Sequence, residues 1–177
     1  VFYRNYKTLT VGKVNCDFNN LYNAMSSITD NNSMTRYLIK IQSGIYHETS
    51  YITCKEFVDI EGTGEDNTIL QFYQAANTSG TPMNTTSCIL LCSNITIKNI
   101  TIKNSPTLYT AGQTTSTVFY NPNTTTNLIL ENLIINSTCS SYYNTGIYIV
   151  NGSSLILRNI NLIIYATNTA GENTGIT

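Results

Sequence analysis

The stretch that decides the fold is NITIKNITIKNS, residues 94–105, because its pattern returns twice further along the chain. Residues 127–137 read NLILENLIINS, and residues 154–164 read SLILRNINLII. On both sides of a central asparagine, apolar side chains alternate with other residues at the period of two that is typical of a β-strand. Each segment therefore predicts two short strands that meet at one asparagine: Asn99, Asn132 and Asn159.

The spacing of the repeats indicates how these strands are connected. The central asparagine recurs after 33 and then 27 residues, which is too long for hairpins and suits one coil of a parallel β-solenoid. A further β-rich piece precedes each repeat and supplies a third strand per coil. The sequence therefore predicts an all-β fold, a right-handed, single-stranded parallel β-helix of about four coils.

The whole chain, residues 1–177, is expected to form one β-helix domain. We place the first coil at residues 36–72 and the further coils at residues 88–105, 116–137 and 145–165. Residues 174–177 resemble the start of another coil, so we expect the chain to be incomplete.

A short helix is predicted before the first coil. Residues 17–29 place apolar side chains three and four positions apart, which is the spacing of an amphipathic helix, and Asp17 is the expected N-cap. The open end of a solenoid exposes core side chains and unpaired strand edges. We therefore expect this helix to cap the solenoid at its N-terminal end.

The recurring asparagines predict a structural ladder. Stacked coils bring Asn99, Asn132 and Asn159 above one another, where each side-chain amide can bond its neighbour. Asparagine also tolerates the left-handed conformation of a tight bend, whereas aspartate would stack like charges. In the first coil, Lys55 and Glu56 are expected at the joint that Lys98 and Asn99 take later.

Composition excludes several classes of function. Charged residues make up 11% of the chain and the formal net charge is −1, so no basic surface is available for nucleic acid. No apolar run is long enough for a transmembrane segment. The five cysteines and one histidine do not follow metal-ligand spacings, and we expect neither a metal nor a cofactor.

Residues 11–72 carry a resemblance to a known family. A helix and a strand are followed by GIYHE at residues 44–48, by a strand pair and by GTGEDNTIL at residues 62–70. This order is similar to the amino-terminal part of pectin methylesterases, within the pectin-lyase-like superfamily of right-handed parallel β-helices. The resemblance implies the fold strongly and the activity weakly, because one fold hosts many activities.

The residues that carry the family's chemistry are missing. Pectin methylesterases use two aspartates in motifs similar to QDTL and DFIFG, and neither motif occurs in this chain. The window where the first aspartate is expected, residues 136–145, reads NSTCSSYYNT. Gln113 resembles a glutamine of the family, but it has no aspartate to assist. We predict no catalytic residue and lean against an enzymatic activity of the chain as given.

Three classes of function remain. The missing aspartates favour a non-catalytic structural or surface protein of an extracellular or virion assembly, with protein partners or self-association. The alternatives are a carbohydrate-binding module, and an N-terminal fragment of a pectinesterase-like enzyme whose catalytic residues lie beyond Thr177. Both alternatives have a polysaccharide as ligand. The expected location is extracellular, at a cell surface or at a virion surface.

Candidate contact residues follow from these hypotheses. Tyrosines in or beside loops are expected to contact carbohydrate or a partner, because aromatic rings are enriched in such interfaces: Tyr109, Tyr142 and Tyr143. His47 and Glu48 form the one pair that looks chemical, and we expect a structural role for this glutamate. Asn-x-Ser/Thr sequons provide candidate N-glycosylation sites at Asn77, Asn84, Asn123, Asn136 and Asn151.

Overall fold

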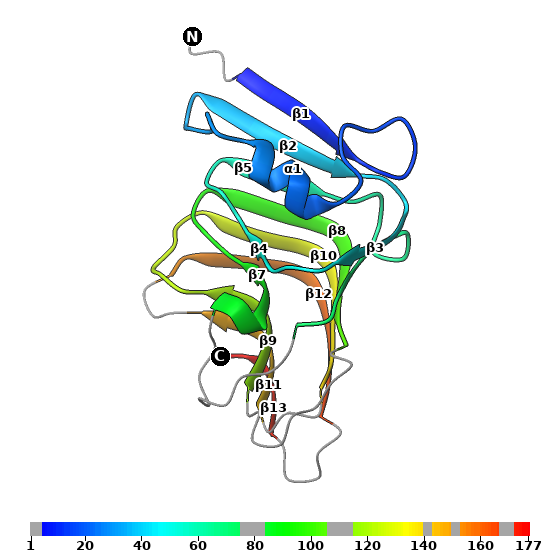
Figure 1. Ribbon diagram of the computed structural model, residues 1–177. Coiled ribbons are helices and arrows are strands. Elements are labelled where there is room, and N and C mark those ends of the chain that lie inside the picture. The colour runs from blue at the N-terminus through cyan, green and yellow to red at the C-terminus, as the bar shows by residue number, and fades with distance from the viewer. Residues whose placement is uncertain (1–4, 75–83, 106–114, 140–142, 150–152, 167–171) are drawn as a thin grey trace.

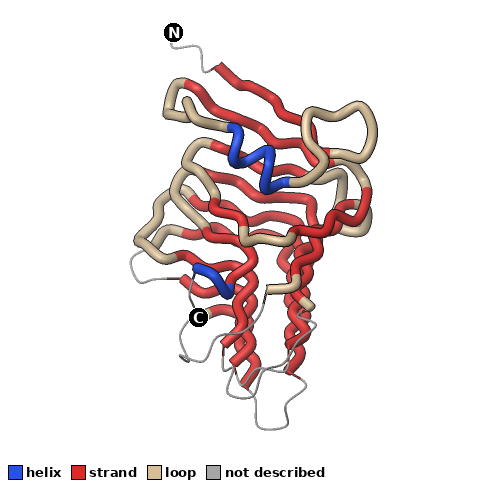
Figure 2. The backbone as a smooth tube through the Cα atoms, viewed as in Figure 1, coloured by secondary structure: helices blue, strands red, loops and turns tan. Residues whose placement is uncertain are grey.

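The computed structural model describes residues 5–74, 84–105, 115–139, 143–149, 153–166 and 172–177 (Figure 1). Their strands pair in parallel and wind into a β-solenoid of about five turns, one more than the sequence predicts. The predicted all-β parallel β-helix is thereby confirmed. Figure 2 shows the strands stacked in layers, with an α-helix near the N-terminal end.

One wall of the solenoid is an eight-stranded sheet. Its main path contains β1 (Asn5–Val11), β2 (Thr35–Ile41), β5 (Val58–Glu61), β8 (Ile95–Asn104), β10 (Leu128–Cys139) and β12 (Leu155–Ala166). Two further strands lie off this path: β6 (Thr68–Phe72) pairs with the second half of β8, and β3 (Gly44–Glu48) pairs with β6. The sequence analysis did not place β1, which pairs with β2 over its full length.

The second wall is a five-stranded sheet in the order β13-β11-β9-β7-β4. Its strands are β4 (Ile52–Thr53), β7 (Ser87–Leu90), β9 (Thr115–Asn121), β11 (Tyr143–Ile149) and β13 (Glu172–Ile176), and the 3-10 helix η1 (Asn84–Thr86) precedes β7. The core lies between the two walls, where inward-facing isoleucines and leucines such as Ile97, Ile100 and Leu133 are fully buried.

The three sequence repeats form β8, β10 and β12, and each runs through its asparagine as one bent strand rather than two. Asn99, Asn132 and Asn159 have φ angles of 59°, 51° and 50°, in the left-handed region. The Asn132 amide donates to Oδ1 of Asn99 at 2.9 Å, and the Asn159 amide donates to Oδ1 of Asn132 at 2.9 Å. These hydrogen bonds tie three successive coils together at one bend.

A second ladder, which the sequence analysis missed, lies at the start of the same strands. Asn94 and Asn127 precede β8 and β10 with φ angles of 61° and 53°. The Asn127 amide donates to Oδ1 of Asn94 at 3.0 Å. The first two repeat units are thus joined at both of their asparagine positions, whereas the third has Ser154 at the first of these positions and is joined to the second repeat through Asn159.

The joint of the first coil is not at Lys55 and Glu56, so that prediction is wrong. Glu61 pairs with Lys98, which places Gly62 beside Asn99. A Cβ atom on Gly62 would lie 2.3 Å from the backbone oxygen of Asn99, and only glycine leaves that oxygen enough space. The sequence pattern misled because it matched side-chain types, whereas the joint of this coil requires the absence of a side chain.

The predicted helix is present but shorter, and its N-cap is different. Helix α1 spans Leu21–Ser27, and the Asn20 side chain caps it by accepting from the backbone N–H of Asn23. Asp17 instead accepts hydrogen bonds from the backbone N–H and the hydroxyl of Thr10, both at 2.8 Å. The prediction of Asp17 as N-cap is therefore wrong. The buried face of α1 packs into the N-terminal end of the core.

Candidate functional site

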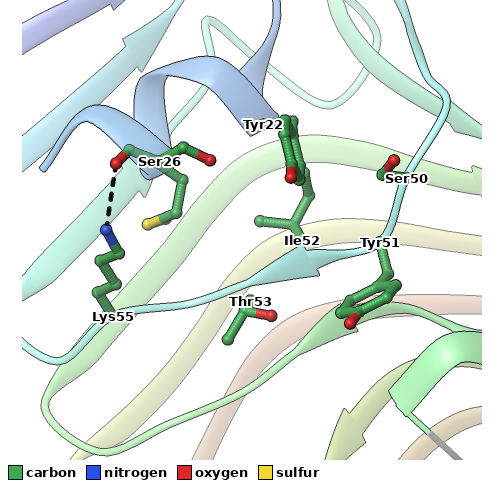
Figure 3. Close-up of a pocket in the computed structure, with 8 residues that line it drawn as sticks. Tyr22, Ser26, Ser50, Tyr51, Ile52, Thr53 and Lys55 are labelled. Atoms are coloured by element: carbon green, nitrogen blue, oxygen red, sulfur yellow. Dashed lines mark hydrogen bonds between the residues drawn. The ribbon is translucent and has the colours of Figure 1, made fainter.

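A cleft of about 410 Å³ lies between helix α1 and strand β4. Figure 3 shows Tyr22 and Ser26 on the helix side and the chain from Ser50 to Lys55 on the opposite side. Met25 and Ile52 complete the lining, so the cleft joins an apolar floor to hydroxyl groups, two phenol rings and an ammonium group. These two wall segments are more than twenty residues apart in the sequence, and only the fold brings them together.

The two tyrosines and the lysine lie at different ends of this cleft (Figure 3). Tyr22 projects from α1 and is 46% exposed, whereas Tyr51 directly precedes β4 and is half-buried. The side-chain hydroxyls that border the cleft belong to Ser26, Ser50 and Thr53. Such a combination of aromatic faces with a few polar groups is typical of sites that bind small organic ligands.

Lys55 is fixed by the last turn of the helix. Its Nζ donates to the backbone oxygen of Ser26 at 3.5 Å and to the backbone oxygen of Ile28. Carbonyl groups at the C-terminal end of a helix carry partial negative charge and favour a cation there. The ammonium group therefore has a defined position at the edge of the cleft.

Glu48 fixes the other end of the same helix. Its side chain is 2% exposed and accepts hydrogen bonds from the backbone N–H groups of Leu21, at 2.7 Å, and Tyr22, at 3.4 Å. Burial raises the pKa of this carboxyl group, and the two backbone hydrogen bonds partly oppose the rise. Glu48 thus has a structural position beneath α1.

His47 points away from Glu48, as expected for neighbours on a strand. Its ring is exposed and stacks on Tyr73, with ring centroids 6.0 Å apart and planes at 13°. The hydroxyl of Tyr73 lies 3.2 Å from Nδ1 of His47. The histidine and the glutamate therefore do not form one chemical site.

The buried Glu48 predicts a specific pH dependence of stability. Because its folded-state pKa lies above the ordinary value of 4.5, the folded protein binds this proton more tightly than the unfolded chain does. Relative to a Glu48→Gln variant, the wild type should therefore gain free energy of unfolding as pH falls from 7 toward 4.5. Urea unfolding at several pH values measures this difference. A relative loss over the same range would contradict the position assigned to this carboxyl group.

The window where the resemblance places the first catalytic aspartate holds a buried amide and hydroxyl cluster. The Asn144 amide donates to the backbone oxygens of Ser137, at 3.0 Å, and Tyr165, at 3.1 Å. The Ser137 hydroxyl donates to Oδ1 of Asn144 at 2.6 Å. Both side chains are fully buried, so this cluster joins β10, β11 and β12 and offers no acid or base.

All ten carboxylate side chains of the sequence fall within the described residues. Six of them accept hydrogen bonds or form ion pairs with lysine, arginine, hydroxyl or backbone N–H groups: Asp17, Asp30, Glu48, Asp59, Glu61 and Glu131. None of the ten lines the cleft between α1 and β4. The acid and base that ester or glycoside hydrolysis requires are therefore not assembled in this cleft.

Of the tyrosines predicted as contact residues, the structure describes Tyr143, which is the first residue of strand β11. Tyr109 and Tyr142 lie outside the described residues, as does Gln113, so the contact role of these tyrosines stays a prediction. Among the sequons, Asn84 and Asn123 are exposed and Asn136 is half-buried, whereas Asn77 and Asn151 lie outside the described residues. Their glycosylation remains a prediction.

The part of the chain that the structure describes includes no group of three or more histidine, cysteine, aspartate or glutamate residues placed to hold a metal ion. Nor does any helix there have the length and apolar character needed to cross a bilayer.

Comparison with known proteins gives one family. The sequence profile of the pectinesterase family matches residues 9–116. No curated protein sequence matches the chain.

Solved pectin methylesterases share the fold. One mutant in complex with a hexasaccharide is 13% identical, with a TM-score of 0.63 over 90% of this chain and 50% of that chain. The carrot enzyme is 15% identical, with a TM-score of 0.62 over 87% and 51% of the two chains. The Erwinia chrysanthemi enzyme is 14% identical, with a TM-score of 0.57 over 83% of this chain and 48% of that chain. The chain thus spans about half the length of these relatives.

Proposed function

The chain belongs to the pectinesterase family, and from that premise we propose that its 177 residues bind a pectin-like polysaccharide without de-esterifying it. The observation that carries this proposal is the distribution of carboxylates. All ten carboxylate side chains lie in the described part of the chain, and six of them are engaged in structural contacts. The window expected for the first catalytic aspartate contains the buried Asn144 and Ser137 instead.

The binding of a polysaccharide is supported by the fold and by the sugar complexes of solved proteins that share it. Two solved pectin methylesterases with this fold are described in complex with hexasaccharides, so a β-helix of this type offers a surface that accommodates an extended sugar chain. If the 177 residues belong to a longer protein, we propose that they contribute recognition and that its remaining part contributes any chemistry. With a pectin-like ligand we also propose an extracellular location.

A second candidate function is an architectural role at an extracellular or virion surface, with proteins or further copies of the chain as partners. One observation favours it. The outward-facing residues Ile156, Ile163 and Tyr165 of β12 are between 41% and 61% exposed. Exposed apolar side chains that gather on one face are frequently covered by a partner. Sedimentation of the purified chain at several concentrations tests this role, which predicts association.

The proposed function is tested by two assays on the same protein preparation. We expect no methanol release from methyl-esterified pectin above the level of a buffer control, because the cleft has no carboxylate and the window expected for the first catalytic aspartate holds Asn144 and Ser137. We also expect the chain to be retarded in a native gel that contains pectin, relative to a gel without it. Methanol release that a single Asp or Glu substitution abolishes would overturn the first part, and unchanged mobility would overturn the second.

A further inference from the structure

We infer that the cleft between α1 and β4 binds one acidic sugar unit, a uronic acid, with its carboxylate at Lys55 and its ring against Tyr22 and Tyr51. This inference rests on the proposed function and adds to it a site and a charge class. It concerns residues that the sequence analysis did not select as contact residues.

The charge of the cleft points to an anion. The ion pairs among the described residues join Lys7, Arg36, Lys98 and Arg158 to carboxylates, and Lys55 is in none of them. The partners of its ammonium group are two neutral backbone carbonyls, so its charge is not cancelled by an acid of the cleft. A carboxylate that reaches Nζ would gain a charge-assisted hydrogen bond.

The other walls of the cleft suit a sugar ring. The C–H face of a pyranose is apolar and packs on an aromatic face, and Tyr22 and Tyr51 supply such faces away from Lys55 (Figure 3). The hydroxyls of Ser26, Ser50 and Thr53 can bond sugar hydroxyl groups. The volume of about 410 Å³ is in the range of sites that enclose small organic ligands.

The wall of the cleft is held in place before any ligand arrives. Glu48 binds the first backbone N–H groups of α1, and Lys55 binds the carbonyls of its last turn. The helix that carries Tyr22 and Ser26 is therefore anchored at both ends to the first coil. A preformed site loses little conformational freedom on binding, which favours affinity for a small ligand.

Titration calorimetry with trigalacturonate tests this assignment on the full 177-residue chain. We expect Lys55→Met to weaken binding about ten-fold, since it removes the charge-assisted bond, and Tyr22→Ala to weaken it about five-fold. The matched controls Lys13→Met and Tyr73→Ala change exposed residues outside the cleft and should leave affinity unchanged. The fully methyl-esterified trisaccharide should bind about ten-fold more weakly than the acid, and added salt should weaken binding of the acid alone.

The possible outcomes separate this inference from the proposed function. Wild-type binding that neither cleft variant weakens would overturn the site, while the proposed function would stand. Equal affinity for the acid and its methyl ester would overturn the charge class. If neither trigalacturonate nor pectin binds the wild type, the proposed function itself fails. Circular dichroism checks the fold of Lys55→Met. If that variant is unfolded, the affinity of Tyr22→Ala for trigalacturonate decides whether the cleft is the binding site, because Tyr22 is exposed and its replacement should leave the fold intact.

Discussion

Replacing Gly62 with alanine should lower the free energy of unfolding by about 3 kcal/mol, because the new methyl group meets backbone as well as side chains. The added Cβ would lie 2.3 Å from the backbone oxygen of Asn99, 2.7 Å from Cγ1 of Ile100 and 2.9 Å from Cβ of Thr68. A backbone oxygen at a fixed joint has no rotamer by which to move away. The two coils must therefore separate locally, which disturbs the pairing of β5 with β8.

Urea unfolding followed by circular dichroism measures this loss, and Gly175→Ala is a matched control. The nearest atom to a Cβ at Gly175 is the end of the Leu162 side chain, at 3.1 Å, which can rotate away. We expect this control to change stability by less than about 1 kcal/mol. Equal stability of Gly62→Ala and wild type would contradict the close approach of Gly62 to the backbone of Asn99.

Replacing Asn132 with valine should cost about 3 kcal/mol, for two separable reasons. The variant loses the hydrogen bonds to Asn99 and from Asn159, and it forces a β-branched residue to adopt a φ of 51°. Asn132→Gly separates the two terms, since glycine accepts this φ and lacks only the amide. We therefore expect the glycine variant to be intermediate in stability.

The same unfolding measurement checks this order, with Asn161→Val as the control. Asn161 is exposed on β12, away from both asparagine ladders, and a valine there should be tolerated on a strand. If Asn132→Val and Asn132→Gly were equally stable, the left-handed conformation would carry no cost. If both variants had the same free energy of unfolding as the wild type, the asparagine ladder would not stabilise the solenoid.

Much of the fold was predictable because it repeats. The alternation around Asn99, Asn132 and Asn159 specifies which residues face the core, and the interval between them specifies parallel coils. The first coil was misaligned because Gly62 at its joint has no side chain to match the later asparagines. The N-cap was misplaced because Asp17 and Asn20 are equally suitable by residue type, and only the hydrogen bond from Thr10 distinguishes them.

The candidate site was not predictable in the same way. Tyr22 lies within the predicted helix, but only the structure shows that it is not among the buried residues of α1 and that it lines the cleft. Lys55 belongs to a different segment, and its role depends on the carbonyl groups at the end of α1. Nothing local in the sequence links these residues. The absence of motifs similar to QDTL and DFIFG, in contrast, could be read from the sequence directly.

The central claim is that this family member binds a pectin-like acidic sugar chain in the cleft between α1 and β4. Titration of the isotope-labelled chain with trigalacturonate, followed by amide NMR shifts, tests it most directly. We expect saturable shifts centred on residues 21–28 and 50–55. Absence of any shift, or shifts confined to amides outside these two segments, would contradict it.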